Sequence, residues 1–280
     1  MKSTSWPAPA KLNLFLHITG RKADGYHLLQ TVFQFIDLQD SISFDINQDP
    51  LIRRISSMPD VSEDDDLVIR AAKLLKQHTG CQLGVDVNVD KQIPEGGGLG
   101  GGSSDAATTL VALNKLWQLG LDKDELASLG LTLGADVPIF VHGHAAWAEG
   151  VGENLTNIEP NEDVYLLIHP GCAVPTAEIF NAADLTRNTP AITIRDFLEH
   201  GGSNDCEKVV RNAYPEVDAA LNWLNDFSPA RLTGTGACLF SAFSTIERAN
   251  QVLSELPDKW RGYVVQGLNR SPLLDRLANA

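Results

Sequence analysis

Two kinds of hydrophobic periodicity occur in the first third of the chain. In the segments 41–47 and 85–90, apolar and polar residues alternate strictly. Such alternation indicates a strand with one buried and one solvated face, which is typical of antiparallel sheets. In the segment 64–80 the apolar residues recur at helical spacing, with acidic residues first, basic residues late and Gly80 at the end. We therefore predict two strands and one helix in these segments.

Capping patterns predict two further helices in the middle of the chain. The first follows a glycine-rich stretch: Ser103, Ser104 and Asp105 are expected to cap its N-terminus, and it should end near residue 120. The second is expected to begin after Asp122, because Glu125 stands three residues later and completes the signature of a capping box.

The second half of the chain repeats the mixture of strands and helices, after an acidic stretch at 157–163 that contains a proline. We take that stretch as the boundary between two lobes. The fold class is predicted to be α+β, with an N-terminal domain of residues 1–155 and a C-terminal domain of residues 156–280. Further strands are expected at 164–171 and 237–243, and further helices at 215–227 and 245–256.

The composition argues against several classes of partner. The chain has 280 residues, of which 43% are hydrophobic and 21% charged, as is usual for globular proteins. Its formal net charge of −14 argues against nucleic acid and anionic membranes as partners, since both attract basic surfaces. No apolar run approaches the length of a membrane span, and the N-terminus lacks the pattern of a signal peptide.

Cysteines and histidines form no pattern that is typical of a metal site. The four cysteines lie far apart without a CxxC pair, so neither a disulfide framework nor a zinc site is expected, and a reducing cytoplasm fits. The close pair His142 and His144 has no third ligand suggested by the sequence. Cys238 is interpreted as buried filling without a catalytic role.

The run from Gly96 to Gly102 is the strongest chemical signal, because six of its seven residues are glycine. Each glycine held in one conformation costs about 0.5–1 kcal/mol relative to alanine, so such a run implies a loop where side chains would obstruct something. A predicted strand precedes the run and a predicted helix follows it. Unpaired N–H groups and the helix dipole favour an anion there. We predict a phosphate site that acts through short-range donors and a bridging cation, because the net charge repels anions.

Three kinds of phosphate loop compete for this run. A Walker A loop needs a lysine near its end, and none lies between Lys91 and Lys115. The dinucleotide fingerprint GxGxxG is matched at Gly96, Gly98 and Gly101, but the strand before it alternates and a proline intervenes. A nicotinamide-dependent oxidoreductase is therefore one alternative, and a flexible hinge is another. A nucleotide triphosphate loop of a different design is favoured.

Five segments, in order along the chain, resemble the GHMP kinase superfamily. They are PAPAKLNLFLHITGRKADGYHLLQT (7–31), PEGGGLGGGSSDAA (94–107), LTLGADVPIF (131–140), GHAAWAEGVGE (143–153) and LTGTGACLF (232–240). The resemblance covers nearly the whole length. It implies a two-lobed GHMP kinase fold, with an N-terminal lobe like the second domain of ribosomal protein S5 and a ferredoxin-like C-terminal lobe.

The resemblance also implies a reaction. The chain is most similar to those superfamily members that transfer the γ-phosphate of ATP, with Mg²⁺, to the 2-hydroxyl of a cytidine-diphosphate sugar alcohol in isoprenoid precursor biosynthesis. A kinase for another small alcohol, of the homoserine or mevalonate type, and a non-catalytic nucleotide-binding regulator are alternatives on the same fold. The implied partner is a small-molecule substrate, and we expect a monomer or a homodimer.

Catalytic residues follow from the same resemblance, position by position. Asp136 matches the catalytic aspartate that takes the hydroxyl proton, and Lys11 matches the cation beside it. Asn13, two residues beyond Lys11 on the same face of a strand, is expected to hydrogen-bond the sugar alcohol. The hydroxyls of Ser103 and Ser104 suit phosphate oxygens or Mg²⁺. The implied ATP-binding residues are Pro94, Glu95, Gly96, Gly97, Gly98, Leu99, Gly100, Gly101, Gly102, Ser103 and Ser104.

The cytidine end of the substrate is assigned in the same way. A hairpin turn is predicted at Asp24 and Gly25. Beyond this turn, the resemblance places the ring of Tyr26 against one face of cytosine, Phe180 against the other face, and His27 at the polar edge. A shorter glycine turn would close over the substrate near the transferring phosphate; its residues are Gly234, Thr235 and Gly236.

Overall fold

The two longest strands form the frame of the fold. A computed structural model describes residues 5–23, 25–56, 62 and 65–280, and in it strand β1 (Ser5–Arg21) pairs antiparallel with strand β2 (His27–Asn47). β1 is buried over most of its length, so its sequence shows no regular alternation of apolar and polar residues. The predicted hairpin turn includes Asp24, which lies outside the described residues, while Gly25 beside it has a left-handed φ of 94°.

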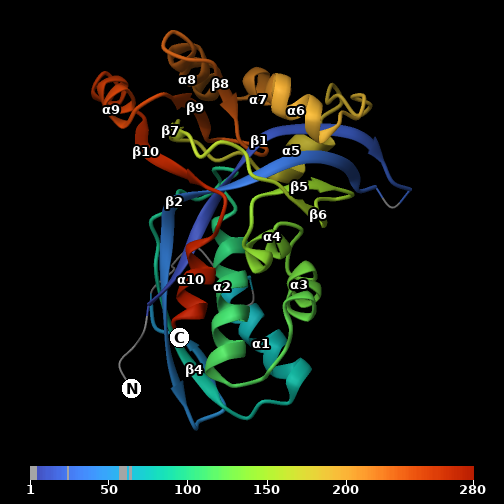
Figure 1. Cartoon of the computed structure of the whole chain (residues 1–280), viewed down its shortest axis with the longest axis vertical. Coiled ribbons are helices and arrows are strands. Elements are labelled where there is room, and N and C mark those ends of the chain that lie inside the picture. Colours follow the sequence, from blue (N-terminus) through green and yellow to red (C-terminus); the bar gives the residue numbers. More distant parts are fainter. Residues whose placement is uncertain (1–4, 24, 57–61, 63–64) are drawn as a thin grey trace.

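β2 is the centre of one continuous sheet that runs through both lobes (Figure 1). It pairs with β1, β4, β5 and β10, and β10 pairs in turn with β7. The main path has the order β3-β4-β2-β10-β7-β9-β8. The remaining strands are β3 (Ile52–Arg54), β4 (Gly84–Asp90), β5 (Ala146–Glu149), β6 (Asn154–Asn157), β7 (Val164–His169), β8 (Ala230–Leu232), β9 (Leu239–Phe243) and β10 (Arg261–Leu268).

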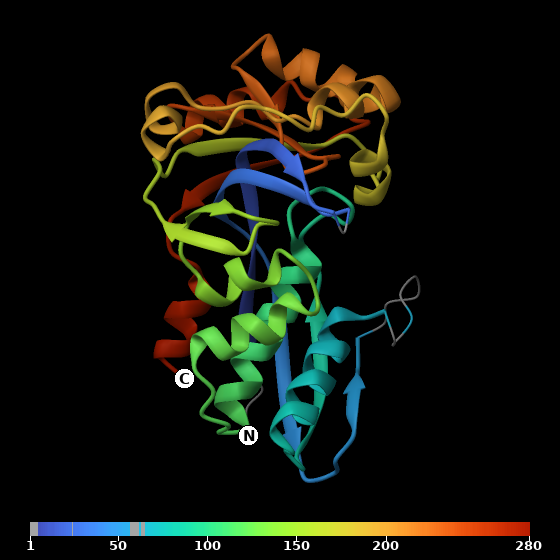
Figure 2. The ribbon, with the colours of Figure 1, turned by 90° about the vertical axis from the view of Figure 1, so that its right-hand side faces the viewer.

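Helices cover the sheet in both lobes. In the N-terminal lobe α2 contacts β1, β2 and the neighbouring helix α1, and in the C-terminal lobe α8 and α9 contact the strands from β7 to β10 (Figures 1 and 2). Their bounds are α1 (Leu67–Thr79), α2 (Gly101–Leu116), α3 (Lys123–Leu131), α4 (Val137–His142), α5 (Thr176–Asn181), α6 (Ile194–His200), α7 (Glu207–Ala213), α8 (Pro215–Asn225), α9 (Ile246–Ser254) and α10 (Pro272–Ala278).

Each lobe has its own apolar core, and a third cluster joins them. The first core includes Leu75 and Leu110, and the second includes Leu166 and Val217. The joining cluster lies along β1 and contains Leu99, the single non-glycine residue of the run from 96 to 102. The phosphate loop predicted from the sequence is thus anchored by a buried leucine at the junction of the lobes.

The chain crosses between the lobes more than once. The C-terminal helix α10 returns to the N-terminal lobe (red in Figure 1), where Leu273 joins the first core and the guanidinium of Arg276 lies 4.6 Å from the ring centroid of Trp6. Conversely, Leu16 and Ile18 of β1 belong to the second core. Each core therefore uses both halves of the sequence, and the boundary at residue 155 stays a prediction.

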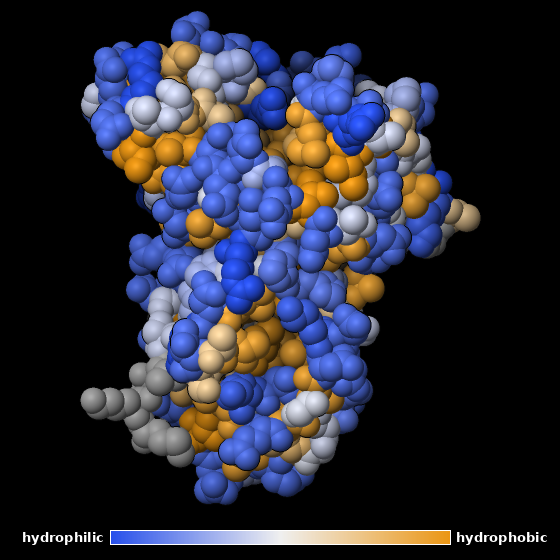
Figure 3. All heavy atoms as spheres, in the orientation of Figure 1, coloured by the Kyte–Doolittle hydropathy of each residue, from blue (hydrophilic) through white to orange (hydrophobic). Residues whose placement is uncertain are grey.

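The surface is mainly hydrophilic on the face drawn in Figure 3, where apolar side chains form separate patches. In the part of the chain that the structure describes, no helix combines the length and the apolar character needed to cross a membrane.

Most of the elements predicted from periodicity are confirmed. The segments 41–47 and 85–90 lie in β2 and β4, and the four elements predicted in the second half correspond to β7, α8, β9 and α9. Helix α1 begins after Asp66, whose side chain accepts the N–H of Val68, and ends at Gly80 with a left-handed φ of 70°. Its predicted first residue, at position 64, lies outside the described residues. The capping box of Asp122 and Glu125 is also confirmed.

The predicted start of the central helix is wrong. Ser103, Ser104 and Asp105 were expected to cap it, but α2 already begins at Gly101, and its N-cap is Gly100, with a φ of 73° and no side-chain cap. The last part of the glycine run is therefore the first turn of the helix. The helix ends at Leu116 and not near residue 120, because Gln118 and Gly120 have positive φ.

Candidate active site

A cavity of about 960 Å³ opens between the two lobes. Its lining comes from β1, β2, the start of α1, α5 and the segment from Pro94 to Ser103. The hairpin end of β1 and β2 lies on the same side of the molecule as α5 (Figure 2). The cavity thus gathers segments from both lobes around the residues 94–102, which we call the glycine loop.

Lys11 in β1 fixes one side of the glycine loop. Its backbone N–H donates to the carbonyl oxygen of Leu99 at 3.0 Å, and its Nζ donates to the carbonyl oxygen of Gly98, also at 3.0 Å. Because both bonds start from one residue of a buried strand, this part of the loop is held in register with β1.

The segment 233–238, which we call the second turn, fixes the other side. The N–H groups of Ala237 and Cys238 donate to the carbonyl oxygens of Gly96 and Gly97, at 3.0 and 3.1 Å. The carbonyl oxygens of the glycine loop therefore point into the protein on both sides. Cys238 is fully buried, in agreement with its interpretation as filling.

The amide groups of the glycine loop show the opposite behaviour. Within the part of the chain that the structure describes, none of the backbone N–H groups from Glu95 to Ser103 donates a hydrogen bond. The first amides of α2 are included in this row, since a helix leaves its first N–H groups unpaired and Gly100 offers no side-chain cap. A row of free donors at the positive end of a helix dipole is suited to an anion with several oxygens, such as a polyphosphate.

Two glycines of the loop are required by the protein itself. A Cβ atom on Gly98 would lie 2.3 Å from the carbonyl oxygen of Thr233, and one on Gly100 would lie 2.9 Å from the ring of Phe140. Both residues also have a φ of 73°. Close packing against the second turn and α4 thus accounts for part of the run, beside any need to admit a ligand.

Lys11 also reaches the predicted catalytic carboxylate. Its Nζ lies 3.5 Å from Oδ2 of Asp136 and donates to Oδ1 of Asn13. The lysine side chain is only 4% exposed, whereas that of Asp136 is 36% exposed and lines the cavity. The buried cation is therefore surrounded by acceptors, and the carboxylate is open to a substrate.

Asn13 has little hydrogen-bonding capacity left for a ligand. Its Oδ1 accepts from Lys11, its Nδ2 donates to Thr31 Oγ1 at 2.9 Å, and its backbone N–H donates to Thr233 Oγ1 at 2.9 Å. Pairing between β1 and β2 is irregular on both sides of the segment 11–13, and such irregularities redirect side chains next to active sites. Asn13 lines the cavity and orients Lys11, and its contact with the sugar alcohol stays a prediction.

The aromatic residues expected to bind cytosine lie together at one end of the cavity. Tyr26 is 65% exposed, and the ring of Phe180 is stacked on that of His27, with 5.0 Å between the centroids and 22° between the planes. Tyr26, His27 and Phe180 all line the cavity. Their placement on the faces and the edge of a cytosine ring stays a prediction.

The structure separates some of the predicted residues from the cavity. Ser103 lines it, but Ser104 does not: its side chain is fully buried and its Oγ has no hydrogen-bond partner. Gly234 and Thr235 of the second turn line the cavity, whereas Gly236 faces Leu232. Of the two serines, Ser103 is thus the better placed to meet a phosphate or a metal ion.

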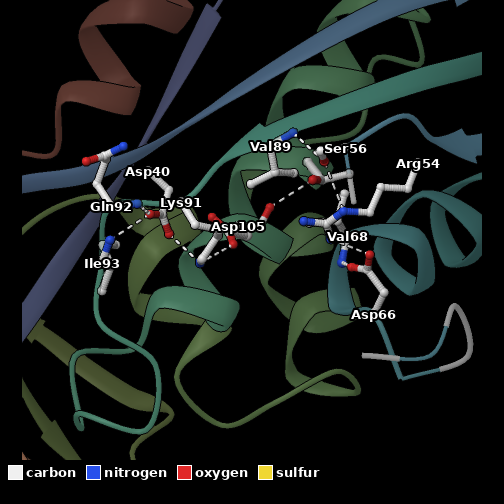
Figure 4. A network of polar contacts seen from close by, with 11 residues as sticks. Asp40, Arg54, Ser56, Asp66, Val68, Val89, Lys91, Gln92, Ile93 and Asp105 are labelled. Carbon is white, nitrogen blue, oxygen red and sulfur yellow. Dashed lines mark hydrogen bonds and ion pairs between the residues drawn. The ribbon is translucent and has the colours of Figure 1, made fainter. Parts of the chain in front are cut away.

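Sequence reasoning missed a group of charges beside the glycine loop, two buried aspartates and a partly buried lysine (Figure 4). Nζ of Lys91 donates to Asp40 and, at 2.8 Å, to Asp105, while Oδ1 of Asp40 accepts the N–H groups of Gln92 and Ile93 at 2.6 and 2.8 Å. One signal was available, because Asp40 has the same parity as the apolar residues of the strand at 41–47. The group ties the segment before the loop to the first turns of α2.

Arg54 and Asp66 form a second missed pair at the start of α1 (Figure 4). The guanidinium of Arg54 donates to Oδ2 of Asp66 and, at 3.1 Å, to Ser56, and both partners of the ion pair are less than a tenth exposed. Both also line the cavity. Their contact joins the end of β3 to the N-cap of α1. The sequence between these two residues shows no periodic pattern of apolar residues that would have indicated the contact.

The carboxyl group of Asp105 has an unusual protonation behaviour. Burial raises its pKa to about 7, the charge of Lys91 opposes this rise, and the carboxylate of Asp40 adds to it. Its second oxygen, Oδ1, is buried without a hydrogen-bond partner. Asp105 is therefore poised between its protonated and ionised forms near neutral pH.

Comparisons with known families agree with this architecture. Residues 66–144 match the family described as "GHMP kinases N terminal domain", and residues 184–262 match "GHMP kinases C terminal". A protein of Alkalilimnicola ehrlichii named 4-diphosphocytidyl-2-C-methyl-D-erythritol kinase is 55% identical over 275 residues, which are 98% of this chain and 94% of that protein.

Solved structures give the same relationship. The chain is similar to the crystal structure of a 4-(cytidine 5'-diphospho)-2C-methyl-D-erythritol kinase, with 30% identity and a TM-score of 0.84 over 94% of this chain and 99% of the other. The chain is also similar to the crystal structure of a mevalonate kinase, with 20% identity and a TM-score of 0.72. This match covers 95% of this chain and 100% of the other. At that identity the second likeness shows the fold alone.

The buried carboxyl of Asp105 leads to a prediction on stability. A pKa raised on folding favours the protonated form in the folded state, so the free energy of unfolding should fall as the pH rises from about 4 to about 7. Asp105→Asn should remove this slope and raise the free energy of unfolding by about 1 kcal/mol or more above neutral pH. Urea unfolding across this pH range measures both effects, with the exposed Asp258→Asn as control. Equal slopes in the wild type and Asp105→Asn would contradict the assignment.

Proposed function

The chain belongs to the GHMP kinases, in the group of the 4-diphosphocytidyl-2-C-methyl-D-erythritol kinases, and we propose that it transfers the γ-phosphate of ATP to the 2-hydroxyl of this sugar alcohol. The products are the 2-phosphate and ADP, in the methylerythritol phosphate pathway of isoprenoid precursor biosynthesis. The 55% identity over nearly the full length of the curated relative supports this assignment of the substrate.

The row of free amides in the glycine loop is the observation that carries the proposal. Its carbonyl oxygens are bound by β1 and the second turn, so the N–H groups from Glu95 to Ser103 are left for the oxygens of the triphosphate. This arrangement binds an anion without a lysine in the loop. It also suits an acidic protein, because short-range donors act where the field of the whole chain is unfavourable.

Asp136 and Lys11 act on the transferring group in this mechanism. The substrate oxygen forms a bond to the γ-phosphorus while the bond from this phosphorus to the bridging oxygen of ADP breaks, and the hydroxyl proton passes to the Asp136 carboxylate. The ammonium of Lys11, 3.5 Å from this carboxylate, stabilises negative charge on the reacting oxygens. Asn13 and the carbonyl oxygen of Gly98 hold the ammonium in position.

Ser103 is the residue best suited to help hold Mg²⁺. Among the described residues, no group of three or more histidines, cysteines or carboxylates is placed to bind a metal ion, so phosphate oxygens and water would supply most of the ligands. A hydroxyl that lines the cavity fits such a site, whereas the buried hydroxyl of Ser104 does not. When bound, the ion neutralises phosphate charge.

The aromatic end of the cavity accounts for the choice of alcohol. Tyr26 is exposed at the rim and can cover one face of cytosine, with Phe180 on the other face and His27 at the edge. Gly234, Thr235 and Gly236 lie in the second turn, where Gly234 is close to Gly98 of the glycine loop and to the side chain of Asn13. Homoserine and mevalonate contain no nucleobase, so a kinase for either alcohol has no ring to stack on such a cluster.

The dinucleotide alternative does not fit the sheet. In a nicotinamide-binding unit the strand after the helix pairs parallel with the strand before the glycine loop. Here the strand after α2 is β5, which pairs antiparallel with β2 and β6, and the parallel partner of β4 is β3, which precedes it in the chain. We place the reaction in the cytoplasm, where the four free cysteines would stay reduced, and we retain the expectation of a monomer or a homodimer.

Turnover with defined alcohols tests the proposal. Purified protein with Mg-ATP should release ADP with 4-diphosphocytidyl-2-C-methyl-D-erythritol, and at least about 100-fold more slowly with homoserine or mevalonate, because these lack the cytosine ring. A coupled ADP assay measures the rates, and NAD should not bind in a parallel titration. Turnover of mevalonate or homoserine in preference to the cytidine substrate would contradict the proposal.

The role of Asp136 is tested by Asp136→Asn. Loss of the proton acceptor should lower kcat by at least about 100-fold, while the Kd for ATP changes little, because the glycine loop is intact. The exposed Asp258→Asn serves as matched control. Normal turnover of Asp136→Asn would refute its assignment as the base.

A further inference from the structure

Arg187, in the segment between α5 and α6, is held in one orientation by three carbonyl groups. Its Nη2 donates to the carbonyl oxygens of Phe180 and Ala182 at 3.0 and 2.7 Å, and its Nη1 donates to that of Leu185 at 3.1 Å. Its Nε–H donates to Nε2 of His27 at 3.1 Å. The direction of this last bond is therefore fixed by the backbone around α5.

The bond from Arg187 determines the tautomer of His27. A guanidinium has only donors, so Nε2 of His27 must be an unprotonated acceptor, and the neutral ring carries its proton on Nδ1. Burial lowers the pKa of His27, and the charges of Arg187 and Arg21 lower it further. The ring is thus kept neutral near pH 7, with one defined donor.

This donor is available to a ligand. His27 lines the cavity, and its Nδ1 has no hydrogen-bond partner among the described residues and is not buried. Phe180 is stacked on the same ring, and its own carbonyl oxygen accepts from Arg187. One guanidinium therefore holds both the edge and the stacking partner of His27.

We infer that Arg187 is a positioning residue that sets the base specificity of the kinase, because it fixes His27 as a hydrogen-bond donor to the base. The inference rests on the proposed function and deepens it. Cytosine presents an acceptor at N3, between its O2 acceptor and its amino group, whereas uracil carries a hydrogen at N3. The Nδ1–H of His27 pairs with N3 of cytosine and meets a second donor in uracil, and two facing donors leave both unpaired.

Base selectivity in an Arg187 variant tests the inference. Wild-type protein should show a higher kcat/KM for the cytidine substrate than for its uridine counterpart, by at least about 10-fold. In Arg187→Met this ratio should fall by about 10-fold, with KM for ATP within about 3-fold of the wild-type value. Arg195→Met, on the exposed face of α6, is the matched control and should keep the wild-type ratio. An unchanged ratio in Arg187→Met would overturn the inference.

A second variant separates an action through His27 from a general role in folding. In a His27→Ala background the substitution Arg187→Met should not lower the selectivity ratio further, because the mediating ring is absent. An additional loss in the double variant would mean that Arg187 acts by another route, and would also overturn the inference.

The tautomer itself is measured without any substrate. Nitrogen-15 NMR of the full chain, labelled at histidine, should show Nδ1 of His27 protonated and Nε2 unprotonated, and Arg187→Met should shift the ring towards the other tautomer. Protonation of Nε2 in the wild type would overturn the inference even if the kinase reaction proceeds. Failure of the protein to phosphorylate the cytidine substrate would instead overturn the proposed function, and the NMR result would still stand by itself.

Discussion

The hydrogen bonds that bind the carbonyl oxygens of the glycine loop are the constraint on which the site depends. β1 holds Gly98 and Leu99, and the second turn holds Gly96 and Gly97. Each peptide group has its N–H and C=O on opposite sides, so fixing the carbonyl oxygens towards the protein directs the amides towards the cavity. The position of α2, which begins within the glycine run without a side-chain cap, extends this row of free donors. We propose that the loop binds anions because its own acceptors are already occupied.

The same hydrogen bonds connect both lobes to the residues proposed to act on the transferring phosphate. Lys11 holds the loop through its backbone and side chain, and its ammonium also meets Asp136. The second turn belongs to the C-terminal lobe, yet Thr233 contacts both the loop and Asn13. A shift of either lobe would therefore move the proposed phosphate site and the proposed catalytic pair, Lys11 and Asp136, together. This coupling explains why Lys11 is buried in a strand that spans both cores and is not carried by a surface loop.

Several features of the protein could be predicted from its sequence, and others could not, for physical reasons. Elements with one buried and one solvated face, such as α1 and β4, show their periodicity directly. β1 is buried on both faces, so periodicity gives no signal there. The start of α2 was misplaced because polar residues suggested a side-chain cap, whereas a glycine in a left-handed conformation begins the helix. Lys91 and Asp40 are 51 residues apart, and Arg187 and His27 are 160 apart, so only the fold reveals these pairs.

We propose that backbone amides, and not a lysine within the glycine loop, hold the triphosphate and direct its terminal phosphate to Asp136. A crystal structure of the protein with a non-hydrolysable ATP analogue and the cytidine substrate would show whether this is so. We expect phosphate oxygens within hydrogen-bond distance of the N–H groups between Gly96 and Ser103, and the acceptor hydroxyl in contact with Asp136. Phosphates bound away from these amides, or an acceptor hydroxyl out of reach of Asp136, would contradict it.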